Sequence, residues 1–234
     1  MNMTIIPAER RHFTDMGWLQ TYWLFSFSSY YDPENMGHGK LRVFNDDVVR
    51  PGTGFPTHPH DEMEIITLVM KGEITHKDSM GNGGVIRAGE VQRMSAGTGL
   101  THSEYNEAEE ALHFYQVWIL PDQAGLPPSY EQKQFDAADF KNTLFPVASG
   151  QGKEGAVSFH TDATIYRSHL EAGRQLEHVT QPDRKLFVYL TAGGLRVDGK
   201  RLANGDQARI DGVAALVLAA EQDADFILID GPDV

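Results

Sequence analysis

The sequence contains no cysteine among its 234 residues. This absence excludes disulfide bonds, zinc sites built from thiolates, and enzymes that use a cysteine nucleophile. A metal ion, if the protein binds one, must therefore be held by nitrogen and oxygen atoms.

Long apolar stretches and clusters of basic residues are also missing. Residues 1–11 lack the apolar segment of about 7 to 15 residues found in a secretory signal, and no run reaches the roughly 18 apolar residues of a membrane helix. We therefore expect a soluble cytoplasmic protein without a membrane partner. With 33 acidic and 20 basic residues, the net charge is −13. Since phosphate binding needs a basic face, direct contact with nucleic acid is not expected.

Short apolar segments separated by glycine turns dominate the chain. Such segments, spaced about every eight to twelve residues, predict a β-sandwich or β-barrel. The alternation of Trp23, Phe25 and Phe27 with smaller residues predicts a strand, and we favour core packing over ligand binding for these aromatic side chains. Further strands are expected at residues 41–49, at 64–76 as two strands meeting at Gly72, at 85–94 and at 112–120.

The composition changes over residues 121–156, which are rich in proline, glycine and polar side chains. We interpret this stretch as a crossover with one short helix near residues 136–140. It divides the chain into units at residues 1–120 and 157–234, and the second unit weakly repeats the first. Aligning the glycines of the two units places other residues where the ligand-type side chains described next occur in the first: Thr180, Pro182, Leu218 and Ala220.

Two segments carry paired ligand-type side chains. Because successive side chains of a strand alternate between faces, His58 and His60 point the same way, as do His102 and Glu104. If the two strands face each other, three imidazoles and one carboxylate converge on one point. Around a divalent ion in an octahedron this set leaves two positions open, and it suits iron, manganese, cobalt, nickel, copper or zinc. We predict a metal site here.

Other acidic and imidazole groups fall near these segments. Glu64 shares the face of His60 if the strand is regular, and it could be a fifth ligand, an outer partner that orients an imidazole, or a general base. We favour the outer or proton-handling role. The remaining histidines occur singly, and of these His76 and His113 lie on expected strands of the same unit and could approach the site.

The same residues resemble the cupin superfamily. Its first motif matches Gly52, His58, His60, Glu64 and Gly72, and its second matches Gly99, His102 and Asn106. More specifically, residues 12–234 are similar to the pirin family. Typical segments are Tyr30-Tyr-Asp-Pro33, Leu41-Arg-Val43, Asn45-Asp-Asp47, Phe55-Pro-Thr-His-Pro-His60, Met63-Glu64-Ile65, His76 with Asp78-Ser-Met-Gly-Asn82, Ser95-Ala-Gly97, His102-Ser-Glu104 and Pro127-Pro128.

This resemblance implies an all-β bicupin, with two tandem jelly-roll-like β-barrels, few short helices and metal in the N-terminal barrel only. It implies the ligands His58, His60, His102 and Glu104, and Fe(II) is the metal we expect first. The implied activity is a dioxygenase that cleaves quercetin-like flavonols with O2, in which Glu64 or Glu104 takes the substrate proton. The alternative is a non-enzymatic, metal-dependent partner of transcription regulators. We expect a monomer, with a protein partner as a further possibility.

Overall fold

Alternating side chains and glycine turns divide the chain into short strands, which the computed structural model describes over residues 2–234. In the first lobe, one sheet has seven strands in the order β12-β9-β6-β11-β4-β3-β2, and a second has four in the order β5-β10-β7-β8. The strands of this lobe are β2 (His12–Asp15), β3 (Leu19–Trp23), β4 (Leu41–Val49), β5 (Thr53–His60), β6 (Glu64–Lys71), β7 (Glu73–Asp78), β8 (Gly83–Arg87), β9 (Glu90–Ser95), β10 (Leu100–Asn106), β11 (Leu112–Ile119) and β12 (Ser129–Gln134).

The second lobe repeats this arrangement. Its sheets have the orders β1-β20-β17-β22-β15-β13-β14 and β16-β21-β18-β19. The strands are β1 (Asn2–Ile6), β13 (Phe145–Ser149), β14 (Val157–Ser158), β15 (Thr164–Leu170), β16 (Gln175–Val179), β17 (Lys185–Ala192), β18 (Gly194–Val197), β19 (Lys200–Ala203), β20 (Gln207–Asp211), β21 (Ala215–Ala220) and β22 (Ala224–Gly231). Two short 3-10 helices among residues 2–234 complete the secondary structure: η1 (Ala8–Arg10) and η2 (Ala137–Phe140).

The all-β expectation with two cupin-like units is confirmed, but the units are not closed barrels. In each lobe the seven-stranded and four-stranded sheets pack face to face, and within residues 2–234 no backbone ladder joins them. Each lobe is therefore an open sandwich, whose aligned inner faces form its core. The ligand-bearing strands β5 and β10 belong to the smaller sheet of the first lobe.

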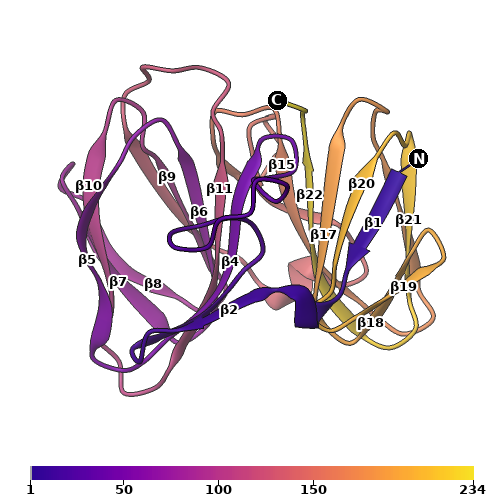
Figure 1. Cartoon of the computed structure of the whole chain (residues 1–234), viewed down its shortest axis with the longest axis horizontal. Helices are drawn as coiled ribbons and strands as arrows, with labels where there is room; N and C mark the ends of the chain where they lie inside the picture. Colours follow the sequence, from indigo (N-terminus) through magenta and orange to yellow (C-terminus); the bar gives the residue numbers. More distant parts are fainter. Residues whose placement is uncertain (1) are drawn as a thin grey trace.

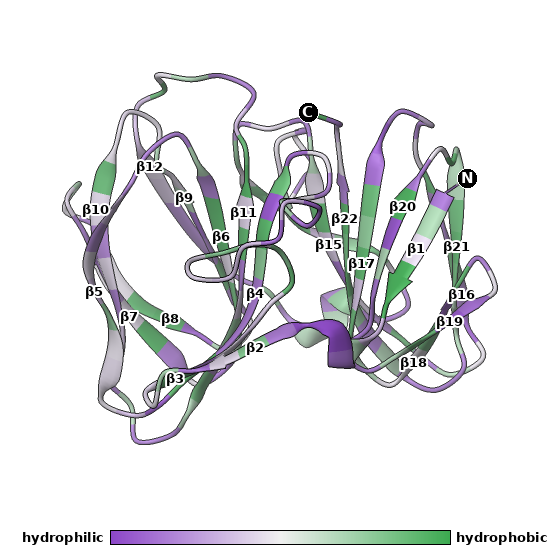
Figure 2. Ribbon diagram, viewed as in Figure 1, coloured by the Kyte–Doolittle hydropathy of each residue, from purple (hydrophilic) through white to green (hydrophobic). Residues whose placement is uncertain are grey.

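The two lobes stand side by side with their larger sheets facing each other (Figure 1). Hydrophobic residues run along the facing strands (Figure 2), and a shared buried core fills the junction. Phe44 of β4 lies with its ring centroid 5.2 Å from Phe187 and 5.0 Å from Tyr189, both on β17. Because large aromatic side chains bury much apolar area, this junction holds the lobes as one unit.

Two segments cross the expected division into residues 1–120, 121–156 and 157–234. Strand β1 pairs with β20 and so belongs to the second lobe. Within the crossover, β12 pairs with β9 of the first lobe and β13 with β15 of the second. The helix expected near residues 136–140 is the single turn η2, begun by a capping box at Asp136. Nowhere in residues 2–234 is a helix both long and apolar enough to cross a membrane.

The strand expected over Trp23, Phe25 and Phe27 is shorter than the alternation predicts. Strand β3 ends at Trp23. The reason is local: the Ser26 hydroxyl donates to the Asp32 carbonyl oxygen and accepts from the Asp32 amide, both at 2.8 Å, which closes a loop. Phe25 then packs 5.9 Å from Phe187 at the lobe junction, whereas Trp23 and Phe27 face a cavity in the first lobe. The single strand expected at residues 85–94 is in fact two strands, β8 and β9.

The interiors of the two lobes differ in polarity. The second sandwich is filled by one continuous cluster of buried apolar residues. The first holds two smaller clusters, between which polar and ionisable side chains are buried. Burying such groups costs free energy unless they are paired or serve a ligand. The buried polar and ionisable side chains of the first lobe therefore lie around the strands that carry the predicted ligands.

Candidate metal centre

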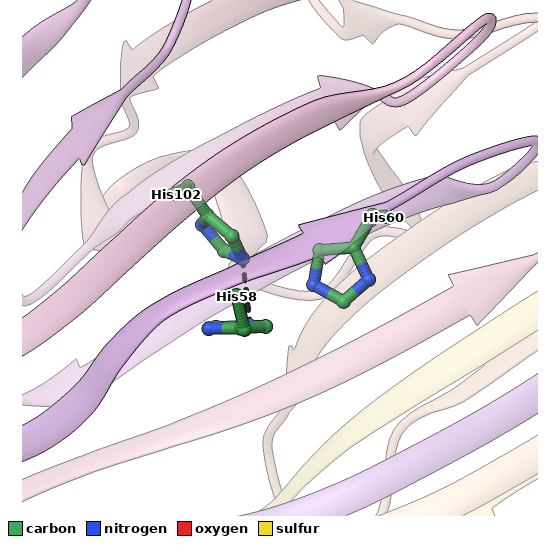
Figure 3. Close-up of side chains that lie close together, drawn as sticks. All are labelled: His58, His60 and His102. Atoms are coloured by element: carbon green, nitrogen blue, oxygen red, sulfur yellow. Dashed lines mark hydrogen bonds between the residues drawn. The ribbon is translucent and has the colours of Figure 1, made fainter.

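Strands β5 and β10 place the histidines opposite one another. His102 pairs directly with His58, and His60 pairs with Leu100. Strand β5 lies at the edge of its sheet, which explains why it accommodates Pro56 and Pro59, since proline removes a ladder donor and is tolerated at edges. The three imidazoles point toward one another (Figure 3).

The three rings are close enough to share one ion. His58, His60 and His102 each offer a ligand atom, and these atoms lie within 4.8 Å of one another. The Nε2 atoms of His58 and His102 are 3.0 Å apart. His58 Nδ1 lies 2.8 Å from the Pro56 carbonyl oxygen. Because a carbonyl oxygen only accepts, neutral His58 carries its proton on Nδ1, which leaves the Nε2 lone pair facing the site.

Glu104 enters the site beside His102. A β-bulge separates the two residues in the pairing with β5. Glu104 Oε2 accepts a hydrogen bond from Gln116 Nε2 at 3.2 Å, whereas buried Oε1 has no hydrogen-bond partner. Glu104 is not part of the close group of His58, His60 and His102; it forms a separate group with His102 and His76, whose ligand atoms lie within 4.8 Å of one another. His102 is common to both groups.

Burial controls the protonation of these groups. Burial, with the neighbouring His58, lowers the pKa of His60 to about 4. Burial and the surrounding imidazoles, His58 first, lower the pKa of His102 to about 2. Burial raises the pKa of Glu104 to about 7, against the opposing hydrogen bond from Gln116. At neutral pH the two histidines are therefore neutral, as metal ligands must be.

The donor set fits a divalent transition metal. Neutral imidazoles and a carboxylate suit zinc, copper, iron and nickel, and no softer thiolate or thioether group is part of the cluster. The unpaired Glu104 Oε1 supports this fit, because a buried carboxylate oxygen without a hydrogen-bond donor is costly unless a cation neutralises it. The residues present could therefore hold such an ion through His58, His60, His102 and Glu104.

A cavity of about 360 Å³ opens beside these residues. Three of the four predicted ligands, His58, His60 and Glu104, line it, and five of the other twelve lining residues are aromatic. An edge-to-face contact with ring centroids 4.9 Å apart joins His60 to Trp118 of this wall. A pocket of mainly apolar surface with a few polar groups is typical of a small-molecule site. The other lining residues are Met16, Trp18, Leu19, Trp23, Phe27, Ser28, Asn45, Asp47, Phe55, Pro56 and Gln116.

Glu64 does not line that cavity. Its buried carboxylate accepts a 2.6 Å hydrogen bond from the Ser95 hydroxyl, and its other oxygen lies 3.3 Å from His160 Nδ1. Its outer-partner or proton-handling role stays a prediction. Of the two single histidines that could approach the site, His76 does so, whereas His113 pairs with Asp46 at 2.7 Å.

Two polar residues of the cavity wall were not singled out as site candidates from the sequence. Asn45 and Asp47 are almost fully buried, and each has an oxygen without a hydrogen-bond partner. Burial, with the nearby carboxylates of Asp46 and Glu104, raises the pKa of Asp47 to about 8. The sequence offered one indication of their position: they flank Asp46 within an expected strand, so side-chain alternation places Asn45 and Asp47 on the same face.

The sequence alignment of the two lobes placed Thr180, Leu218 and Ala220 over His58, His102 and Glu104. The strand pairing of the structure moves each of these second-lobe positions back by two residues. His76 pairs with Glu104 in the first lobe, as Val197 pairs with Leu218 in the second. His178 stands opposite Leu216, as His58 stands opposite His102. The equivalents of His58, His102 and Glu104 are thus His178, Leu216 and Leu218. His178 Nε2 is 2.6 Å from Asp230, which also binds Arg184 and Thr180.

Comparisons with known proteins agree with this architecture. The family model for pirin matches residues 7–119, and the model for a quercetinase C-terminal cupin domain matches residues 146–230. The chain is 41% identical over 228 residues to quercetin 2,3-dioxygenase of Escherichia coli K12, covering 97% of each chain. It is 42% identical over 225 residues to a pirin-like protein of Caulobacter vibrioides, covering 96% of this chain and 97% of that one.

Solved structures show the same relationship. The crystal structure of YhhW from E. coli superposes with a TM-score of 0.95 at 40% identity, covering 100% of this chain and 99% of that one. The structure of bacterial pirin YhhW in complex with nickel(II) gives 0.94 at 38% identity, covering 100% of both. Both the sequence identity and the matched fold extend over both lobes. The chain therefore belongs to the pirin family.

Proposed function

We propose that this protein is a metal-dependent dioxygenase that cleaves quercetin-like flavonols with O2. The observation that carries the proposal is the position of the imidazole cluster, at the edge of an aromatic-lined cavity of about 360 Å³. Relatives at about 40% identity carry the name quercetin 2,3-dioxygenase, which supports the same substrate class.

The four ligands of this proposal are His58, His60, His102 and Glu104. A divalent metal held by them would act as a Lewis acid toward the hydroxyl and carbonyl oxygens of a flavonol. Fe(II) is our first choice, with nickel supported by the complex of a related bacterial pirin. Manganese, cobalt, copper and zinc fit the same donor types.

The cavity wall accounts for the binding of a flat aromatic substrate. Trp18 and Phe55 contact each other edge to face with centroids 4.9 Å apart, and Phe27 meets Trp118 in the same way at 5.3 Å. Aromatic surfaces of this kind bind planar rings by stacking and by excluding water. The wall thus positions a substrate ring against the ligand side chains.

Glu104 is the group best placed to accept a substrate proton. Glu104 lines the cavity, whereas Glu64 does not. Burial raises the pKa of the Glu104 carboxyl to about 7 without an ion, and a bound cation would lower this pKa. Gln116 donates to Oε2 and holds the carboxylate in place. Glu104 thus combines the roles of ligand and proton acceptor in this proposal.

A direct assay tests the proposal. Metal-free protein is loaded separately with each candidate ion and given quercetin, while the flavonol absorbance and dissolved oxygen are followed. We expect both to fall together with at least one metal. If none of the metals supports turnover, the proposed dioxygenase activity is refuted.

The non-enzymatic alternative, a metal-dependent partner of transcription regulators, would instead show a protein that co-purifies and is released when metal is removed. The aromatic side chains that line the cavity beside the imidazoles favour the enzyme. The monomeric state and the cytoplasmic location stay predictions.

A further inference from the structure

His76 lies immediately behind the ligand cluster. Its side chain is completely buried on β7, between the ring of Tyr130, stacked at 5.2 Å, and the ring of His102 at 5.4 Å. His76 belongs neither to the lining of the cavity nor to the group formed by His58, His60 and His102. It lies beside His102 and pairs across the sheet with Glu104, so it is a neighbour of two of the four predicted ligands.

Two nitrogen atoms at this contact lack partners. The Nδ1 atoms of His76 and His102 are both buried, and neither has a hydrogen-bond partner. Leaving a buried imidazole nitrogen unpaired costs about 1 to 3 kcal/mol, so two such atoms on adjacent rings need an explanation. The two atoms are not hydrogen-bonded to each other in the structure, and a rotation of either ring that brought them within hydrogen-bond distance would satisfy both at once.

The protons can be assigned from the outer contacts. His76 Nε2 faces Asp78 Oδ2 at 3.4 Å. Asp78 is itself fixed, because its carboxylate accepts from the amides of Met80 and Asn82 and from Asn82 Nδ2, each at 2.9 Å. A carboxylate only accepts, so neutral His76 carries its proton on Nε2 and presents the Nδ1 lone pair toward His102.

We propose that His76 and Asp78 are positioning residues for the ligand His102: when the Nε2 atoms of His58 and His102 both face an ion instead of hydrogen-bonding to each other, the His102 proton lies on Nδ1 and is donated to His76 Nδ1, which holds the ring with its Nε2 lone pair toward His58 and His60. The inference rests on the metal site of the proposed function. Ligating histidines usually donate their second ring nitrogen in this way to a carboxylate, a carbonyl or water. Here the acceptor is a second imidazole, which Asp78 orients in turn.

A competing arrangement uses the same atoms differently. His76, His102 and Glu104 could themselves hold an ion, with His102 binding through Nδ1. His58 and His60 would then be dispensable for metal binding. The two arrangements make opposite predictions for variants of His58 and His76, so metal binding distinguishes them without reference to catalysis.

The experiment measures cobalt(II) affinity of the purified full-length, metal-free protein by competition with a chelator. The informative variant is Asp78→Asn, whose amide can donate to His76 Nε2 and so reverse the His76 tautomer. It retains an oxygen for the amides of Met80 and Asn82. We expect affinity to fall about 10- to 100-fold, with a changed visible cobalt spectrum and a thermal midpoint of the metal-free protein close to wild type.

Two replacements at His76 complete the test. His76→Leu removes the acceptor and should lose a similar factor, whereas His76→Asn places an amide oxygen near the position of Nδ1 and should restore part of the affinity. His178→Gln in the second lobe is the matched control, because His178 is also buried and paired with an aspartate. It should leave cobalt affinity within about twofold.

The outcomes separate this inference from the proposed site. Wild-type affinity and spectrum in both Asp78→Asn and His76→Leu would overturn the positioning role while leaving the four ligands intact. Complete loss of binding in His76→Leu, with retention in His58→Ala, would assign the ion to the second group. Equal losses in His76→Asn and His76→Leu would also contradict an acceptor role for Nδ1.

Discussion

The Nε2 atoms of His58 and His102 lie 3.0 Å apart, on residues directly opposite each other in β5 and β10. Two nitrogen ligands bound at about 2.1 Å and at right angles to each other would be separated by about 3.0 Å. The spacing therefore suits neighbouring positions of an octahedral ion. The strand register sets this distance before any ion arrives.

The first prediction concerns these two ligands. His58→Ala and His102→Ala should each lose stoichiometric metal during dialysis against a weak chelator, because only two imidazoles and one carboxylate would remain. Metal content by elemental analysis is the measurement. His113→Ala is the control, since His113 pairs with Asp46 away from the cluster. Full metal retention by either ligand variant would place the site elsewhere.

A second prediction concerns the close approach of β5 to β10 at Gly54. A Cβ added there would lie 2.2 Å from the Glu104 carbonyl oxygen and 2.5 Å from Tyr105 Cα. Gly54→Ala should therefore displace β5 and cost about 1 to 3 kcal/mol of unfolding free energy, together with weaker metal binding. Gly84→Ala in the same sheet meets open space and should change neither quantity. Urea unfolding and chelator competition measure the two effects.

The third prediction follows from the buried carboxyl groups of the metal-free protein. The folded-state pKa values of Asp47 and Glu104 are raised to about 8 and about 7, so between about pH 4 and pH 7 the folded protein binds protons that the unfolded chain has released. These two carboxyl groups make the unfolding free energy fall as pH rises, whereas His60 and His102, whose pKa values are lowered to about 4 and about 2, make it rise up to about pH 6.5, so the contribution of Asp47 is read by comparing a variant with wild type. Asp47→Asn should make the slope of unfolding free energy against pH more positive than that of wild type by up to about 1.4 kcal/mol per pH unit.

Urea unfolding at pH 5 and pH 7, with a chelator present, measures that slope. Asp183→Asn is the matched control, because Asp183 is exposed on the surface of the second lobe. An unchanged slope in Asp47→Asn relative to wild type would show that Asp47 is not protonated in the folded state.

A fourth prediction addresses the aromatic wall. Trp18→Ala removes the ring that contacts Phe55 at the cavity and should raise KM for quercetin about 3- to 10-fold, the loss expected for one aromatic contact, with a smaller change in kcat. Phe13→Ala is the control: Phe13 lies on the neighbouring strand β2, is 49% exposed and does not line the cavity. A KM equal to wild type in Trp18→Ala would exclude this wall from substrate binding.

Local rules accounted for much of the first lobe. The glycine turn at Gly72 does separate β6 from β7, and residues 41–49 form β4 as expected. The rules failed where a side chain overrode the periodicity. Ser26 ended β3 by binding the Asp32 backbone, and a contact between residues six apart in a loop leaves no trace in a two-residue repeat.

The sequence by itself determined the donor chemistry. The absence of cysteine limited the donors to nitrogen and oxygen, and strand alternation paired His58 with His60 and His102 with Glu104, since both properties are local to a few residues. The tertiary structure decided which distant residues these pairs meet. Strand pairing across the sheet placed His76 opposite Glu104 and Asp78 opposite His102. It also turned Glu64 toward Ser95 and His160 and placed His178 in the second-lobe position that corresponds to His58, because neighbours across a sheet depend on register, which single strands do not encode.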